Sequence, residues 1–243
     1  MRVLLLRFDA PLMSFGGVMV DQHGPTDRFP GTSLLTGLFG NALGWRHSDA
    51  DRLEALQARI EYAARWDVAP EPLLDYHTVD LGQPKMREAG WTTRGEPEHR
   101  AGGEDARYGT HIRLRHYWVN GVMTVAVALA GEENPTTDDL VRALQEPARP
   151  LFIGRKTCLP AAPILLGTVE ASDVLAALRK TPPSARRPKQ AAPEMEACWP
   201  DRIGETATSR RVVVYDRRDW RNQIHAGRRI RIEGLLQLDG GST

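Results

Sequence analysis

The order of the apolar segments up to Val169 constrains the fold of this chain more than any other sequence feature. The chain begins with a nearly continuous apolar run, typical of a buried central strand, and later segments show either helical spacing or strict alternation. Ignoring insertions, the order is strand, helix, strand, strand, helix, strand, which is the split-βαβ, ferredoxin-like pattern. The predicted strands are 2–8, 60–68, 73–79, 112–118, 122–130 and 164–169, and the predicted helices are 34–43 and 137–144.

We therefore expect an α+β fold with a ferredoxin-like (RRM-like) βαββαβ core over residues 1–180. Residues 82–110 hold six glycines among many charges without periodicity, which predicts a protruding arm or a partly disordered loop inserted at about 82–111. Asn120-Gly121 predicts a hairpin between the segments on either side of it. Residues 181–243 are expected to form a β-rich C-terminal extension, with a Pro-rich linker over 181–200, a helix capped by Ser172 before it, and strands at 211–215 and 229–236.

Charge is unevenly distributed along the chain. The formal net charge is only +1, but residues 179–231 hold 14 Lys and Arg against 6 Asp and Glu, a local net of +8. A basic segment of this kind attracts polyanions, although a solvated surface is its commoner cause. In the last strand Arg229 and Arg231 alternate with Ile230 and Ile232, which predicts one basic face and one buried face.

The composition also limits the cellular setting. Cys158 and Cys198 have neither metal-ligand spacing nor the pattern of a disulfide framework. The sequence shows no apolar run of membrane-spanning length and no signal peptide. We therefore expect a cytoplasmic protein with no membrane partner and no cofactor.

Residues 25–44 read as a polar loop that runs into an apolar helix. Ser33 is predicted to cap the helix, and Thr26, Arg28 and Thr32 surround its N-terminus. Free N–H groups and the positive end of the helix dipole make this a predicted anion site suited to phosphate. The alternative interpretation is an ordinary capped helix.

A second loop, RPLFIGRKTCLP at 149–160, has the composition of a phosphate-binding turn. Gly154 permits an unusual backbone angle, and Arg155, Lys156 and Thr157 follow it directly with donors for phosphate oxygens.

Several patches together resemble a known family. They are APLMSFG at 10–16, GPTDRFP at 24–30 leading into the helix, DYHTV at 75–79, LFIGRKTC at 151–158 and PILLGTVEA at 163–171. In this order they resemble the CasD-type subunits of the type I-E CRISPR surveillance complex Cascade, which belong to the RAMP superfamily. The resemblance covers roughly the first 180 residues, and the tail has no quotable match.

The resemblance implies a noncatalytic subunit that binds the 5′ handle of the crRNA, caps the backbone filament and supports target DNA interference. Its implied partners are the crRNA, the adjacent backbone subunit through the arm, the large PAM-recognising subunit and, through the complex, target DNA. Phosphates are held by Arg and Lys, and bases are read by stacking or edge contacts. The predicted RNA-binding residues are Phe15, Arg28, Ser33, His77, Tyr108, His111, Arg113, Gly154, Arg155, Lys156 and Thr157.

Other functions stay open from the sequence. The main alternative is a metal-independent endoribonuclease that processes precursor crRNA, for which Tyr76, His77, His111, His116 and Lys156 are candidates. A metal site is disfavoured because Asp75 and His77 share a strand face without a third ligand. A nucleotide-dependent enzyme lacks its glycine-rich fingerprint, and a purely structural scaffold is distinguishable by salt-dependent RNA affinity.

Overall fold

The main sheet of the protein has seven strands, seen in a computed structural model that describes residues 1–19, 21–80 and 110–239. Every neighbouring pair in it is antiparallel. The order is β10 (Ser209–Val214), β13 (Arg229–Leu236), β9 (Met195–Pro200), β4 (Ile60–Val68), β7 (Val122–Leu129), β1 (Arg2–Asp9) and β8 (Leu165–Glu170).

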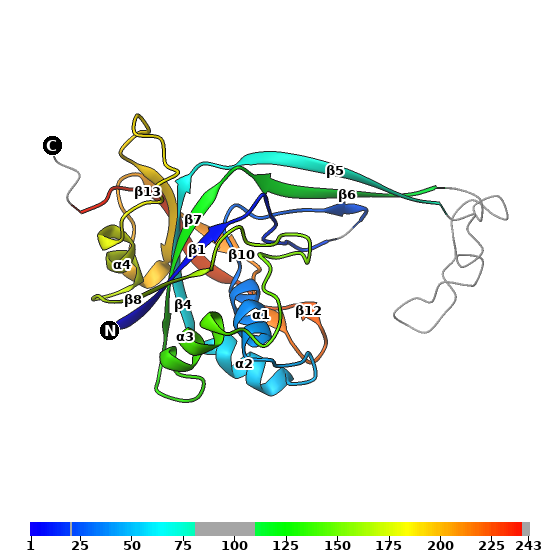
Figure 1. Cartoon of the computed structure of the whole chain (residues 1–243), viewed down its shortest axis with the longest axis horizontal. Helices are drawn as coiled ribbons and strands as arrows, with labels where there is room; N and C mark the ends of the chain where they lie inside the picture. The colour runs from blue at the N-terminus through cyan, green and yellow to red at the C-terminus, as the bar shows by residue number, and fades with distance from the viewer. Residues whose placement is uncertain (20, 81–109, 240–243) are drawn as a thin grey trace.

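Both faces of this sheet are covered (Figure 1). One core lies under α1 (Thr32–Ala42), α2 (Ala50–Arg59) and α3 (Thr137–Gln145), and the other lies under α4 (Val174–Lys180). On β1, Leu4 and Leu6 enter the first core while Val3 and Leu5 enter the second. The apolar run at the start of the chain follows from this burial on two sides. The fold is α+β, as predicted.

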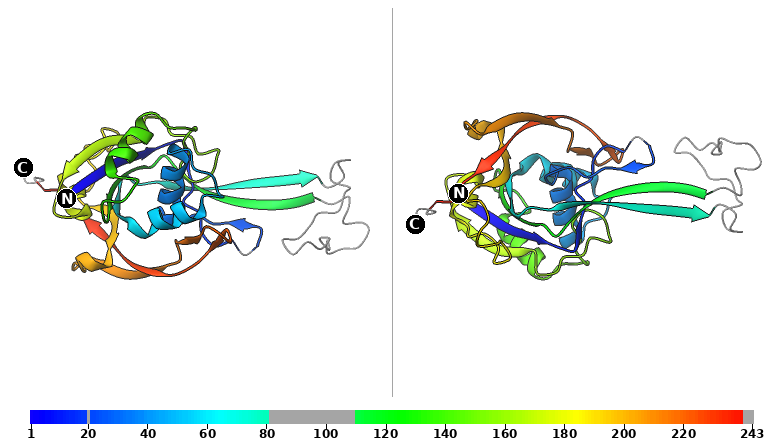
Figure 2. Two further views of the ribbon diagram at one scale, coloured as in Figure 1. Left: turned by 90° about the horizontal axis from the view of Figure 1, so that it is seen from below. Right: turned by 90° about the horizontal axis from the view of Figure 1, so that it is seen from above.

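A second sheet forms the arm of the molecule. In it β5 (Glu71–Asp80) and β6 (Thr110–Val119) pair antiparallel, and β2 (Leu12–Met13) and β3 (His23–Gly24) pair with β6. The β5–β6 ribbon extends well beyond the body (Figures 1 and 2). The insertion predicted at about 82–111 lies outside the described residues except for its last two positions.

The predicted hairpin at Asn120-Gly121 is wrong. The chain does turn there, with Asn120 at φ 61°, but β6 pairs with β5 while β7 pairs with β1 and β4. Because β1 and β4 occupy both edges of β7, no edge is left for β6. The turn instead passes the chain from the arm sheet to the main sheet.

The linker predicted over 181–200 is also wrong in its last part. Residues 195–200 form β9, which lies between β13 and β4 inside the main sheet. Its side chains Met195, Ala197, Cys198 and Trp199 are buried, so this short run contributes to both cores. The prolines on either side indicated a linker, and the segment is too short to show the apolar alternation of a strand clearly.

The chain ends in one long hairpin. β10 and β13 pair from Ser209–Gly234 to Val214–Arg229, and the same register resumes in β11 (Arg218–Asp219) and β12 (Ile224–His225). Figure 2 shows this hairpin, orange to red, at the outer edge of the body, with its tip beside α1. The expected strands at 211–215 and 229–236 are confirmed, apart from their ends.

The basic face predicted for the last strand is wrong, because its arginines point into the body. Arg231 is buried, pairs with Glu233 and lies over the Phe29 ring. Ile230, by contrast, is exposed. Much of the positive charge counted in this segment is therefore neutralised internally.

The helix starts differ from expectation at two places. α4 is capped by Asp173, whose carboxylate accepts from the Ala176 N–H at 2.8 Å, and not by Ser172. α1 begins at Thr32 after Gly31, so Ser33 is not its cap. α3 follows its prediction, with a capping box between Thr136 and Asp139. In the described part of the chain, no helix is long and apolar enough to cross a membrane.

Candidate functional site

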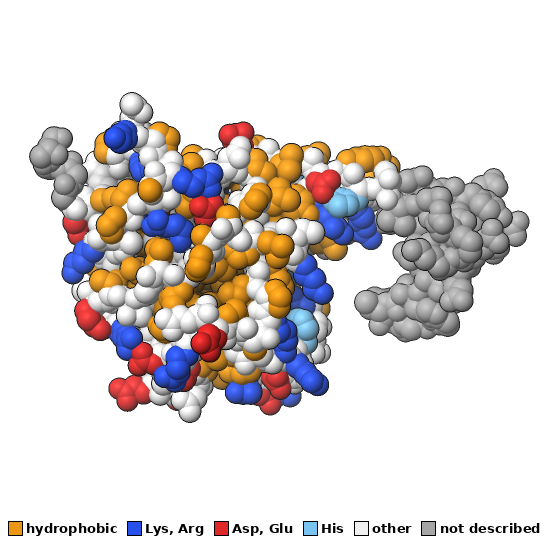
Figure 3. Space-filling view, viewed as in Figure 1, with side chains coloured by type: hydrophobic (Ala, Val, Ile, Leu, Met, Phe, Trp, Pro, Cys, Tyr) orange, Lys and Arg blue, Asp and Glu red, His pale blue; other side chains and the backbone are white. Residues whose placement is uncertain are grey.

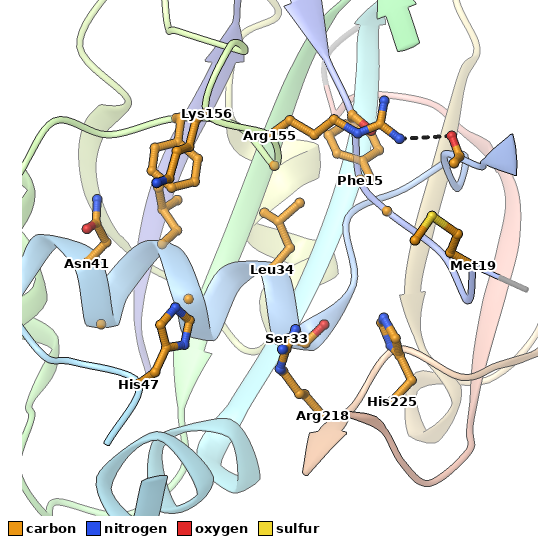
Figure 4. A pocket seen from close by; sticks show the side chains of 18 of the residues that line it. Phe15, Met19, Ser33, Leu34, Asn41, His47, Arg155, Lys156, Arg218 and His225 are labelled. Atoms are coloured by element: carbon orange, nitrogen blue, oxygen red, sulfur yellow. Dashed lines mark hydrogen bonds between the residues drawn. The ribbon is translucent and has the colours of Figure 1, made fainter. Parts of the chain in front are cut away.

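A cleft of about 1040 Å³ opens between α1, the loop before β8, the base of the arm and the tip of the C-terminal hairpin. Seven Lys and Arg residues line it, and among the lining residues that the structure describes none is Asp or Glu. Figure 4 shows Arg155 and Lys156 on one side of the cleft, with His47, Arg218 and His225 on the other. The cationic residues are Arg46, Arg113, Arg115, Arg149, Arg155, Lys156 and Arg218.

The loop that carries Arg155 is held by its glycine. Gly154 has φ 96°, and a Cβ built on it would lie 1.5 Å from the Ser14 carbonyl oxygen. A closed turn follows, in which Cys158 N–H donates to the Arg155 carbonyl and Ile153 N–H donates to the Cys158 carbonyl, both at 2.8 Å. This contact fixes the loop against the start of the arm and presents Arg155 and the two residues after it to the cleft.

Carbonyl groups, and not carboxylates, orient the cleft cations. Arg155 donates to the Gly24 and His116 carbonyls at 2.8 and 3.1 Å and lies over the Tyr117 ring. Arg149 donates to the Gly44 and Trp45 carbonyls, just after the end of α1, at 2.7 Å each. Because carbonyls are neutral, these guanidinium groups are positioned while their full charge stays in the cleft. Figure 3 shows Lys and Arg side chains along the side of the body beneath the arm.

The N-terminus of α1 is not an anion site, which corrects the prediction for this helix. The Asp216 carboxylate accepts from the Thr32 N–H at 2.9 Å, and the Asp216 carbonyl accepts from the Ser33 N–H at 2.9 Å. The next two N–H groups donate to the Gly31 carbonyl. The helix dipole therefore already has an internal carboxylate at the place where a phosphate was expected.

Arg229 completes this buried contact. It donates to the Asp216 carboxylate at 2.6 to 3.1 Å and to the Tyr62 hydroxyl at 2.6 Å. Burial alone would raise the pKa of Asp216, but the hydrogen bonds and charge of Arg229 hold this pKa below its usual value. The contact attaches the waist of the hairpin to α1, next to the tip that lines the cleft.

Seven of the eleven predicted binding residues line the cleft. They are Phe15, Ser33, Arg113, Gly154, Arg155, Lys156 and Thr157. The ring of Phe15 belongs to the core, 5.8 Å from Trp66, so it forms the floor. Lys156 and Thr157 are exposed at the rim.

The other four predicted residues lie elsewhere. Arg28 pairs with Glu196 at 2.5 Å, outside the cleft, and its guanidinium lies over Trp66 and Trp118. His77 lies on β5 of the arm and pairs with Asp75 at 2.5 Å. His111 is in β6, and Tyr108 lies outside the described residues.

Sequence reasoning missed six basic residues of the cleft, which are Arg46, His47, Arg115, Arg149, Arg218 and His225. Arg218 and His225 oppose each other at the hairpin tip, in a segment that reads only as a polar turn. The local excess of positive charge was the one signal that pointed to it. Of the described candidates for ribonuclease chemistry, only Lys156 lines the cleft; Tyr76 and His77 lie on the arm and His116 packs beside His23.

The sequence of the chain is similar to those of CRISPR-associated proteins. The family model described as CRISPR-associated protein (Cas_Cas5) matches residues 3–232. The chain is 33% identical to the CRISPR system Cascade subunit CasD of Escherichia coli (strain K12) over 183 residues, which is 72% of this chain and 75% of that protein.

Two solved structures are also similar. A chain of a CRISPR RNA-guided surveillance complex matches with a TM-score of 0.67 and 25% identity, over 97% of this chain and 90% of that one. A structure titled as a Cas protein shares the fold, with a TM-score of 0.61 and 23% identity over 97% and 95%. The match over nearly the whole chain and the identity to CasD agree: the chain belongs to the Cas5 family of CRISPR-associated proteins and resembles the CasD-type subunits of Cascade.

Proposed function

We propose that this chain is a noncatalytic subunit of a Cascade-type complex and that its cleft binds the 5′ handle of the crRNA. The observation that carries the proposal is a cleft lined by seven cations and, among its described lining residues, no carboxylate, in a chain whose net charge is only +1. Charge segregation of this kind suits a polyanion, and the similarity to CasD makes guide RNA the expected one.

The cleft suits single-stranded RNA. Arg113, Arg155 and Lys156 are positioned for phosphates along one wall, with Thr157 as a neutral donor. His47 and His225 are exposed on the opposite wall, where their rings can stack on bases or bind base edges. An RNA strand held between the two walls would have its phosphates on the wall with Arg155 and Lys156 and its bases toward the wall with His47 and His225.

The remaining roles follow from the same family. We propose that the β5–β6 arm packs on the adjacent backbone subunit, because Leu73, Leu74, Tyr76 and Ile112 are exposed on it. Capping of the backbone filament, contact with the large PAM-recognising subunit and support of target DNA interference are parts of this proposal. We also propose a ferredoxin-like core within residues 1–180, supported by the antiparallel order β8-β1-β7-β4.

The ribonuclease alternative has less support. Metal-independent cleavage of RNA needs an acid and a base at one phosphate. The described candidate residues for that chemistry are divided between the arm and the cleft rim.

One experiment separates the two functions. Purified protein is incubated in EDTA with labelled repeat RNA, and retention and cleavage are scored on one gel. We expect intact RNA that is retained more strongly with the native handle than with a scrambled one. The Arg155→Gln, Lys156→Gln double variant is expected to bind at least about tenfold more weakly, whereas Lys189→Gln in the Pro-rich loop serves as the matched control. A discrete cut in EDTA would establish the nuclease instead, and equal retention of the scrambled RNA would contradict handle binding.

A further inference from the structure

The C-terminal hairpin has two faces along its whole length. Its inner face carries Val214, Asp216 and Arg229, which are buried or largely buried, and then Arg218 and His225, which line the cleft. Since neighbouring residues of a strand point to opposite sides, the residues between these face away from the body. From Val213 and Ile230 to the tip of the hairpin, only the inner face is covered by described residues of the chain.

The outer face bears a row of large apolar side chains, here termed the outer strip. Val213, Tyr215, Ile224 and Ile230 are 51%, 59%, 58% and 42% exposed. Val213 and Ile230 are directly opposed across the two strands. Ile232, two residues beyond Ile230 on the same face, is fully buried in the second core. The outer strip is therefore an uncovered continuation of a core face, which soluble proteins expose mainly at interfaces.

Unpaired positive charge lies beside the outer strip. Arg217 and Arg228 are exposed, and neither forms an ion pair with any residue that the structure describes. Arg210 and Arg211 on β10 differ, since they pair with Glu233 and with Asp201 and Glu205. A surface complementary to the outer strip would therefore carry carboxylates.

The hairpin also ends the main sheet. β10 is the last strand in the strand order, so its backbone pairs on one side only among the described residues. It carries three consecutive valines, 212–214, and no proline. An edge of this composition is a template for pairing unless another chain covers it.

We propose that the outer strip is a docking surface for a partner protein of the assembled complex, one that presents apolar side chains flanked by Asp or Glu. Aliphatic Val and Ile favour protein over nucleic acid, because nucleic-acid surfaces rely on aromatic and basic groups. Exposed Tyr and Arg beside aliphatic residues are typical of protein interfaces. The inference goes beyond RNA binding and rests on the proposed function only for membership of a multi-subunit complex.

The test uses the full chain co-expressed with the other subunits of the complex and its guide RNA. Two double variants, Tyr215→Thr with Ile230→Thr and Arg217→Glu with Arg228→Glu, change the apolar and the charged parts separately. Leu166→Thr on the opposite edge strand and Lys189→Glu are the matched controls. We expect each strip variant to lower the amount of co-purified partner at least tenfold, with melting temperature unchanged, and the controls to have no effect.

Hydrogen exchange on the wild-type protein gives a second measurement. We expect amides 209–215 to exchange at least tenfold more slowly in the complex, but not in the free chain and not with guide RNA alone. Protection by RNA alone would assign the strip to nucleic acid, and protection in the free chain at doubled mass would assign it to a second copy. Unchanged exchange in the complex, or failure of the wild-type chain to co-purify with any subunit, would overturn the proposal. If the free wild-type chain does not retain repeat RNA, this result would instead count against the proposed function.

Discussion

Replacement of Asp216 by alanine tests how the C-terminal hairpin is attached to α1. Its carboxylate is 3% exposed and accepts from the Thr32 N–H and from two nitrogens of Arg229, whose side chain is 17% exposed. Removing one partner of a buried ion pair leaves the other charge uncompensated, at a cost of about 3–5 kcal/mol. Since the free energy of unfolding of globular proteins is about 5–15 kcal/mol, the Asp216→Ala variant is expected to lose a large share of its stability.

Urea denaturation measures this loss. With an m-value of about 2 kcal/mol/M, a change of about 4 kcal/mol lowers the unfolding midpoint by about 2 M. Asp216→Asn is the matched variant: its amide oxygen can still accept from the Thr32 N–H, but the charge that Arg229 needs is gone. We expect it to fall between wild type and alanine.

The stability difference between wild type and Asp216→Ala is expected to depend on pH in one direction. Because the folded pKa of Asp216 is lower than its ordinary value of 3.8, the contact contributes fully above that value and is lost as pH falls through the folded pKa. The stability difference between wild type and Asp216→Ala should therefore shrink below about pH 4. A stability difference of less than about 1 kcal/mol at pH 7, or one that persists undiminished in acid, would show that the Asp216–Arg229 ion pair does not stabilise the attachment of the hairpin to α1.

Three further predictions address the loop, the cleft and the second core. Gly154→Ala places a methyl group against the Ser14 carbonyl, so it should lower the unfolding midpoint and weaken RNA retention; wild-type retention would contradict the loop geometry. Arg155→Gln should reduce the slope of log affinity against log salt by about 0.7, measured by titration at several salt concentrations, and an unchanged slope would exclude a phosphate contact. Asp67→Ala leaves the fully buried Arg65 unpaired and should cost about 3–5 kcal/mol in urea denaturation, whereas a cost under about 1 kcal/mol would show that carbonyls alone satisfy the guanidinium.

The elements with strong local patterns could be predicted from sequence. β1 is an apolar run because both of its faces are buried, and the alternating apolar residues Tyr62, Ala64 and Trp66 of β4 all pack in the first core. α3 begins where its Thr136–Asp139 capping box places it. In these segments the local signal and the tertiary environment agree.

The errors arise where a distant residue decides the outcome. Thr32 is capped by Asp216, which lies 184 positions later, so the helix N-terminus reads as free in the sequence. The Asn120-Gly121 dipeptide is typical of hairpin turns, but β1 and β4 pair with the two edges of β7, so β6 cannot pair with it. Local patterns carry no information on which edge of a strand is occupied.

The cleft itself was predicted only in part for the same reason. Gly154 and Arg155 stand in one short motif that has a phosphate-binding composition. Arg46 and Arg218 reach the cleft from α1's end and from the hairpin tip, and nothing in their local sequence places them together.

The most direct test of the central claim is ultraviolet cross-linking of the full chain to its labelled repeat RNA, followed by mass spectrometry of the joined peptides. If the cleft binds the RNA, cross-links are expected in peptides that line it, above all those containing residues 149–157 and 217–228, and these cross-links should be lost in the Arg155→Gln, Lys156→Gln variant. Cross-links confined to the α4 face of the sheet, with none in the cleft, would contradict this binding.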